Sequence, residues 1–127
     1  MNSEFYYPAK LTFGNGRVYV SDSYNNRIQA FTHQGEFLFQ FGGMGFWRGT
    51  FRVASGVAVG PDGLLYAADY YNDRVQVFDP EGKFITSFGG EGTGNGEFKG
   101  PTGVAVSEDK IYAVDWGNHR VQEFIRR

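Results

Sequence analysis

One sequence pattern occurs three times in this chain, at intervals of 47 and then 46 residues. The copies read VYVSDSYNNRIQAF at 18–31, LYAADYYNDRVQVF at 65–78 and IYAVDWGNHRVQEF at 111–124. Self-similarity at a period of roughly 20 to 50 residues is typical of repeat architectures. A residue that recurs in every copy is expected to hold the repeat together, so a specific function should lie where the copies differ.

Composition sets the outer limits of what the chain can do. At 127 residues it has the length of one ordinary domain, and we expect a single domain over 1–127. The net charge of −2 provides no field that would attract nucleic acid or an anionic membrane. The chain has no cysteine, which excludes disulfides, thiolate metal sites and a cysteine nucleophile.

The sequence MNSEFYYPAK at its start has no apolar segment behind a positive charge, and no apolar run approaches membrane-spanning length. We therefore expect a soluble protein without a signal peptide, cytoplasmic by default.

The middle copy predicts four β-strands joined by short turns. Strand-forming residues occur at 55–59, 64–68, 74–78 and 83–88, and GPDG, residues 69–73 and DPEG separate them. Connections of about two to five residues join adjacent antiparallel strands. No segment has the 3.6-residue apolar period of a helix. The predicted unit is an all-β, four-stranded antiparallel meander, with strands named a to d. In its b–c turn, Asn25, Asn72 and Asn118 are predicted to take the left-handed position, which asparagine tolerates.

Four-stranded units repeated at roughly 40 to 50 residues are typical of β-propeller blades. The segment GEFKGPTGVAV at 96–106, followed by IYAVD and NHRVQEF, resembles the NHL repeat, whose family forms six-bladed β-propellers. The resemblance covers about residues 4–127, although residues 8–12 depart from the pattern of 101–105. It implies four-stranded blades at approximately 8–43, 54–90 and 101–127, the last without its outer strand.

Three blades cannot close a ring, because each blade buries both of its faces against neighbours. Two chains would supply the six blades of the NHL family, so we expect a homodimer with two equivalent junctions between blade one and blade three. The outer edge of the last blade would then be strand c, unless residues 1–7 of the partner lie along it.

An aspartate and an arginine recur five residues apart, and we expect them to face each other across the b–c hairpin as a charge-assisted pair. Three identical copies around a ring argue against catalysis, because an active site needs unlike groups that converge once. We therefore predict a structural role for these pairs, which are Asp22 and Arg27, Asp69 and Arg74, and Asp115 and Arg120.

Ligand binding is predicted at the end of the blades where the b–c and d–a loops emerge. These loops vary between copies and are rich in aromatic residues, whereas the opposite end carries plain polar turns. We expect a non-enzymatic scaffold that binds a protein, peptide or carbohydrate there. The candidate ligand-binding residues are Tyr24, Phe46, Trp47, Arg48, Tyr70, Tyr71, Trp116 and His119.

No catalytic residue, metal site or cofactor is predicted. His33 and His119 lie at opposite ends of their blades and cannot share a site within one chain, and no catalytic motif occurs. Three alternatives remain open. One is a lactonase- or lyase-type enzyme with a metal in the central channel, using residues such as Asn26 and Asp73. Another is an RNA-binding module, which is not favoured because the basic residues near the aromatic end are few. The third is a fragment or engineered half-propeller without activity of its own.

Overall fold

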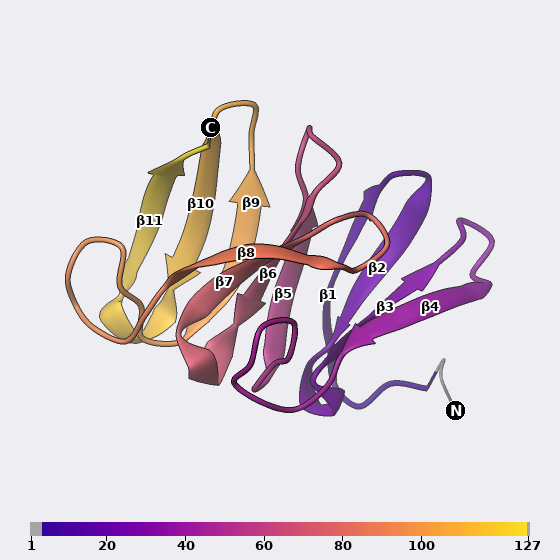
Figure 1. Cartoon of the computed structure of the whole chain (residues 1–127), viewed down its shortest axis with the longest axis horizontal. Helices are drawn as coiled ribbons and strands as arrows, with labels where there is room; N and C mark the ends of the chain where they lie inside the picture. Colours follow the sequence, from indigo (N-terminus) through magenta and orange to yellow (C-terminus); the bar gives the residue numbers. More distant parts are fainter. Residues whose placement is uncertain (1–3, 127) are drawn as a thin grey trace.

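Three antiparallel β-sheets make up residues 4–126, which are the residues that the computed structural model describes (Figure 1). The first sheet contains β1 (Pro8–Gly14), β2 (Arg17–Asp22), β3 (Arg27–Phe31) and β4 (Phe37–Gly42). The second contains β5 (Ala54–Val59), β6 (Leu65–Asp69), β7 (Arg74–Phe78) and β8 (Phe84–Gly89). The third contains β9 (Pro101–Val106), β10 (Lys110–Asp115) and β11 (Arg120–Ile125). Single 3-10 turns join the second and third strands of each sheet: η1 (Ser23–Asn25), η2 (Tyr70–Asn72) and η3 (Trp116–Asn118).

The predicted all-β propeller fold is confirmed. In every sheet each strand pairs with the strand next to it in sequence, which is the predicted meander. The four strands expected in the middle copy are β5 to β8, displaced by no more than one residue at either end. We call the sheets blade 1, blade 2 and blade 3. Blade 3 has three strands, and no strand among residues 4–126 pairs with the outer edge of β11.

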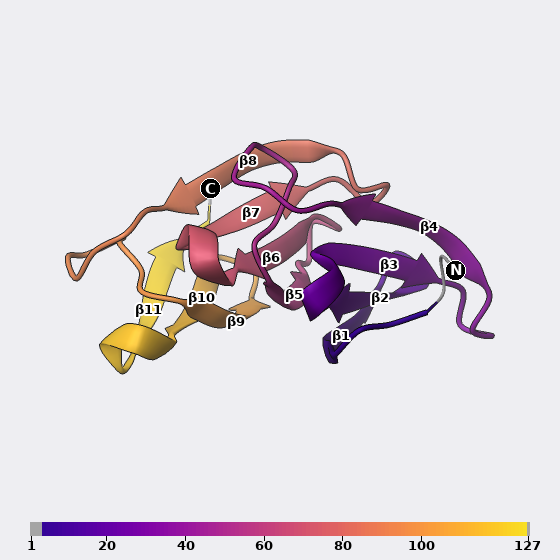
Figure 2. The ribbon, with the colours of Figure 1, turned by 90° about the horizontal axis from the view of Figure 1, so that it is seen from below.

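The blades lie side by side like the sectors of a fan. Along the inner side, β5 contacts β1 of the preceding blade and β9 of the following one, and β4 and β8 form the outer arc (Figure 2). Along β7, alternate residues point toward opposite neighbours, because successive side chains of a strand point to opposite faces. Val75 and Val77 pack toward blade 3, whereas Phe78 packs toward blade 1. We call the side of a blade that contacts the next blade in sequence its forward face, and the other side its backward face.

The core lies between the blades. One apolar cluster fills the junction of blades 1 and 2, and a second fills the junction of blades 2 and 3. A fully buried phenylalanine from the connection that leads into the later blade lies in each junction, Phe51 in the first and Phe98 in the second. Each blade is therefore stabilised chiefly by its neighbours, as expected for a repeat protein.

The prediction for the asparagines of the b–c turn was wrong by one residue. The left-handed backbone conformation occurs at Asn26, Asp73 and His119, with φ of 54°, 53° and 55°. The preceding asparagine lies inside the 3-10 turn and donates a hydrogen bond to the aspartate that ends strand b. Since its side chain must reach back to this carboxylate, the next residue has to reverse the chain.

Candidate functional site

The carboxylate of Asp69 is a structural centre of blade 2. Its Oδ2 accepts hydrogen bonds from Arg74 Nε at 2.7 Å, Asn72 Nδ2 at 2.9 Å and Gln76 Nε2 at 3.3 Å. Its Oδ1 accepts one from the main-chain N–H of Arg52 at 2.8 Å. Arg52 belongs to the segment that enters the blade from outside, so the carboxylate joins the blade to that incoming chain.

The same arrangement occurs in all three blades. Asp22 accepts from Tyr6 N at 2.6 Å, and Asp115 accepts from Lys99 N at 2.8 Å. In each blade the arginine and the glutamine also donate to the main-chain carbonyl two residues before that N–H, which belongs to Glu4, Thr50 or Glu97. We call the four side chains the clasp and the residues that they hold the entry segment. The clasps are Asp22, Asn25, Arg27 and Gln29; Asp69, Asn72, Arg74 and Gln76; and Asp115, Asn118, Arg120 and Gln122. The entry segments are 4–7, 50–53 and 97–100.

Residues 4–7 therefore belong to their own blade. Besides the clasp bonds, Ser23 N donates to Tyr7 O at 3.2 Å and Tyr24 N donates to Tyr6 O at 3.1 Å. Blade 1 thus holds Glu4 O, Tyr6 N, Tyr6 O and Tyr7 O of its own chain, and the pairing of residues 1–7 with the outer edge of a partner's last blade stays a prediction. Residues 1–3 lie outside the described residues.

Two of the clasp aspartates differ electrostatically although their partners are the same. Burial raises the pKa of Asp69 above its ordinary value of 3.8, and the hydrogen bonds and the charge of Arg74 offset only part of this effect. Burial acts in the same direction at Asp115 but is weaker, so the hydrogen bonds from Lys99 N, Asn118 and Arg120 hold its pKa below 3.8. The two carboxylates differ in burial because blade 2 has a neighbouring blade on both sides, whereas blade 3 has one on one side only.

Tyrosines surround a hollow at the predicted end of the blades, beside the inner strands. Its volume is about 340 Å³. The ring of Tyr7 stacks on Tyr24, with centroids 5.0 Å apart and planes at 29°. On the opposite side Tyr70 meets Tyr71 edge-on at 4.8 Å. The side chains that line the hollow are those of Tyr7, Ala9, Lys10, Ser23, Tyr24, Val53, Ser55, Tyr70, Tyr71 and Thr102.

The b–c loop of blade 3 extends this aromatic surface. Trp116 is 62% exposed and lies 6.5 Å from the ring of Tyr70. Arg52 lies over the ring of Tyr71 at 5.9 Å. We call Tyr7, Tyr24, Tyr70, Tyr71 and Trp116 the aromatic face. Four of them are predicted ligand-binding residues, and the structure brings these four together.

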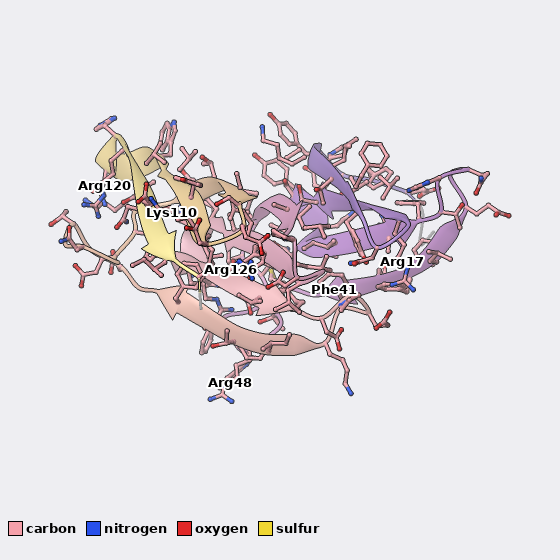
Figure 3. All side chains as sticks on the ribbon, turned by 90° about the horizontal axis from the view of Figure 1, so that it is seen from above. Arg17, Phe41, Arg48, Lys110, Arg120 and Arg126 are labelled. Atoms are coloured by element: carbon pink, nitrogen blue, oxygen red, sulfur yellow. The ribbon has the colours of Figure 1, made fainter. Side chains whose placement is uncertain are left out.

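The other predicted residues lie apart from this group. Phe46 and Trp47 stack on each other at 4.7 Å in the connection from β4 to β5. The carbonyl of Trp47 accepts from Arg74 Nη2, which places the loop over blade 2. Arg48 projects from the outer side of the molecule, near β8 (Figure 3). None of these three residues lines the hollow, so the predicted surface consists of an inner and an outer part.

His119 occupies the left-handed position after η3, at the edge of blade 3. Its equivalents Asn26 and Asp73 both bind the next blade. Asn26 Oδ1 accepts from Val53 N at 2.7 Å, and Asp73 Oδ1 accepts from Gly100 N at 2.8 Å. Within residues 4–126 no blade follows blade 3, and no hydrogen bond involves the imidazole of His119.

Tyr7 was not among the predicted binding residues. Its position in the repeat corresponds to Val53 and Gly100, which differ from it in chemistry, so the pattern gave no reason to select it. Across residues 4–126 no group of three or more His, Cys, Asp or Glu side chains is arranged to hold a metal ion. No helical segment in that range is long and apolar enough to cross a bilayer.

Three blades of antiparallel strands, joined by repeated clasps, define a repeat β-propeller protein. The chain belongs to the six-bladed β-propeller family, whose model matches residues 58–124, more than half of the chain. The NHL repeat model matches residues 5–31, which agrees with the resemblance found in the sequence.

Solved structures with the same fold include several enzymes. A virginiamycin B lyase from Staphylococcus aureus is 16% identical, with a TM-score of 0.66 over 95% of this chain and 42% of its own. A gluconolactonase from Xanthomonas campestris is 16% identical, with a TM-score of 0.68 over 97% of this chain and 39% of its own. A luciferin-regenerating enzyme is 15% identical, with a TM-score of 0.64 over 91% and 39%. The chain thus spans about two fifths of the length of these proteins, and the likeness shows the fold. A search of curated proteins found no match.

Proposed function

We propose that this protein is a non-enzymatic binding scaffold whose aromatic face binds a peptide segment of a partner protein. The observation that carries the proposal is the convergence of Tyr7, Tyr24, Tyr70 and Tyr71 on one hollow. Tyrosine and tryptophan offer large, rigid contact areas with a polar tip and lose little conformational entropy on binding. This combination suits a peptide, which presents both apolar side chains and main-chain hydrogen-bonding groups.

The serine hydroxyls of the hollow are already hydrogen-bonded within the fold, so the surface that a ligand meets is mainly aromatic and apolar. Ser23 Oγ donates to Ala54 O at 2.8 Å, and Ser55 Oγ donates to Pro101 O at 2.8 Å. These hydroxyls therefore serve the fold, and the tyrosines remain for the ligand. Among the described lining residues, Lys10 is the charged one, which favours a peptide with an acidic residue near β1.

Selection from a random-peptide display library tests this proposal, with the full chain as the immobilised target. We expect acidic, aromatic-containing peptides whose affinity falls at least tenfold in Tyr24→Ala and in Tyr71→Ala. Lys10→Glu should shift the selected peptides away from acidic residues. Glu81→Ala, in a turn at the opposite end, serves as the matched control and should leave binding unchanged. Peptides that lose affinity in Glu81→Ala and keep it in Tyr71→Ala would refute the proposal.

The Trp47→Ala variant separates the two parts of the predicted surface. A peptide confined to the hollow should bind this variant as it binds the parent, whereas a longer peptide that crosses blade 2 should lose affinity.

The enzymatic alternative has its own measurement. If a metal bound in a central channel, adding Ca²⁺ would raise the melting temperature, because a ligand of the native state stabilises it.

A further inference from the structure

The backward face of blade 1 and the forward face of blade 3 have no neighbouring blade within residues 4–126. Each corresponds to one half of the junction between blades that the chain contains twice. Val121 on the forward face of blade 3 is 64% exposed, whereas its equivalents Ile28 and Val75 are fully buried inside the two junctions. Leu11 on the backward face of blade 1 is 59% exposed, and its equivalent Val57 is 5% exposed. Both end faces therefore carry side chains of the type that the internal junctions bury, and exposed apolar patches of this kind mark interaction surfaces.

The phenylalanine that fills each junction is also present at the open end. Phe5 lies in the entry segment of blade 1 as Phe51 and Phe98 lie in those of blades 2 and 3. Phe51 and Phe98 are fully buried, whereas Phe5 is 40% exposed and contacts Phe31 at 5.8 Å. Since the clasp of Asp22 holds this segment without a preceding blade, Phe5 is in position to receive one.

We propose that two copies of this chain close one six-bladed ring, in which blade 3 of each binds blade 1 of the other and His119 accepts a hydrogen bond from the main-chain N–H of Tyr7 of the partner subunit. The equivalent bonds exist at both internal junctions, from Val53 N to Asn26 and from Gly100 N to Asp73. In the neutral imidazole one ring nitrogen is an acceptor, and Nδ1 stands at the same distance along the side chain as the Oδ1 of Asn26. Tyr7 has the φ of 64° that places its N–H as in Val53, whose φ is 65°.

The opposite end of the junction offers a second pair of contacts. At the junction of blades 1 and 2, Tyr19 Oη and Arg17 Nη1 each donate to the carbonyl of Pro80, at 2.9 Å. Tyr112 and Lys110 hold the equivalent positions of blade 3, and His33 holds that of Pro80. The ring therefore places the hydroxyl of Tyr112 and the ammonium of Lys110 next to the carbonyl of His33 of the partner subunit.

The closing junction is smaller than the internal ones. Phe41 of β4 and Phe88 of β8 add aromatic surface to the internal junctions, and the described part of blade 3 has no fourth strand to supply an equivalent. On the backward face of blade 1, Leu11 and Phe13 of the inner strand β1 replace the smaller Val57 and Val59 of β5. The larger side chains of blade 1 add apolar surface against the inner strands of blade 3, which correspond to the strands that β5 contacts in the first internal junction. The occupant that matches this face is therefore a second copy.

The mass of the 127-residue chain in solution tests the ring, by sedimentation velocity and light scattering at micromolar concentration. We expect a closed dimer of two 14.2 kDa chains that does not grow at higher concentration. Val121→Glu should shift it to monomer, while Ile85→Glu, on the outer strand β8, should leave the dimer intact. Circular dichroism checks that both variants stay folded. A folded parent monomer, or an open series of higher oligomers, would overturn the proposal.

His119 has a conservative and a disruptive replacement. His119→Asn reproduces the acceptor of Asn26 and should keep the dimer, whereas His119→Ala should weaken it at least fivefold. Equal dimer dissociation constants for the two variants would remove His119 from the junction.

If Val121→Glu fails to fold, crosslinking tests the ring instead, since the chain has no cysteine of its own. Copies with Lys110→Cys mixed with copies with Gln34→Cys should be joined by a short bis-maleimide, and a Lys83→Cys and Gln34→Cys mixture should not. Equal yields would contradict the ring.

Discussion

Arg74 donates from Nε to Asp69 at 2.7 Å and from Nη2 to the carbonyl of Thr50 at 2.9 Å, so one guanidinium binds both the blade and the chain that enters it. The carboxylate is fully buried and the arginine side chain is only 15% exposed. This placement explains why the pair recurs in every copy of the repeat: it holds the start of each blade against its middle strands.

Asp69→Ala should destabilise the fold by about 3 kcal/mol, because it leaves the guanidinium of Arg74 without its buried partner. Urea unfolding monitored by circular dichroism measures this loss. Glu81→Ala is the matched control. It removes the surface ion pair with Arg17 from the side of Glu81, whose side chain is 64% exposed, and leaves the bond from Arg17 to Pro80 in place, so it should cost less than about 1 kcal/mol. Equal losses for the two variants would show that the clasp is no more important than a surface pair.

The clasps of blades 2 and 3 should respond to acid in opposite directions. The pKa of Asp115 is lowered by folding, so its ionised form stabilises the protein above about pH 4, and this contribution is lost as the pH falls through the folded pKa. Burial raises the pKa of Asp69, so the folded state binds its proton more tightly and the contribution of Asp69 declines as the pH rises above 3.8.

The single chain, kept monomeric by Val121→Glu, is the parent for this measurement, because a second copy would cover blade 3. Its unfolding free energy and those of its Asp69→Asn and Asp115→Asn variants at several pH values between about 3 and 6 measure both effects. On acidification the advantage of the parent over Asp115→Asn should shrink, and its advantage over Asp69→Asn should grow. Parallel pH curves for the two differences would contradict the assigned burial.

Val53→Gly should stabilise the protein by about 1 kcal/mol. Val53 is β-branched and has a φ of 65°, a conformation that costs such a residue about 1 to 3 kcal/mol and that Gly100 adopts in the next blade without strain. The N–H that binds Asn26 is retained. Val57→Gly is the control, since Val57 is buried at an ordinary strand position and its loss should destabilise the fold. Thermal unfolding distinguishes the two, and a lower melting temperature for Val53→Gly would argue against backbone strain at this site.

Phe98→Ala and Phe5→Ala should have different effects although the residues are equivalent. Phe98 is completely buried between blades 2 and 3, so its truncation should cost about 3 to 5 kcal/mol of stability. Phe5 lies at the open end, so Phe5→Ala should change the stability of a single chain little and weaken association of two copies. Chemical unfolding gives the first effect and sedimentation velocity the second. A large loss of stability in dilute Phe5→Ala would assign it to the core of one chain.

The architecture was predictable because it repeats. The strands of the middle copy lie within one residue of their expected bounds, and the pairing of Asp69 with Arg74 follows from their five-residue separation across a hairpin. The position of the left-handed residue was not predictable from propensity alone. Asparagine favours that conformation, but the carboxylate of Asp22 competes for the side chain of Asn25 and shifts the reversal to the next residue.

The composition of the aromatic face was predictable only in part. Loop polarity placed Tyr24, Tyr70, Tyr71 and Trp116 at one end, but it could not separate residues beside the inner strands from those of the outer loop. Tyr7 joins the face because the clasp of Asp22 fixes the main chain of residues 4–7 beside η1. This main-chain contact recurs in every blade, but the residue at this position is Val53 or Gly100 in the other two, so a comparison of the copies could not select Tyr7.

Every clasp holds main-chain atoms, and this has an evolutionary consequence. Tyr6, Arg52 and Lys99 are three different residues, yet each donates the same main-chain N–H to an aspartate. A tandem duplication of 46 or 47 codons therefore creates a new blade whose attachment is already encoded, provided that its entry segment keeps the phenylalanine that fills the junction. The connections between the blades can then change in sequence, since the clasp binds their main-chain atoms. The number of blades can thus increase by duplication while the surface of the loops changes by mutation, and neither process restricts the other.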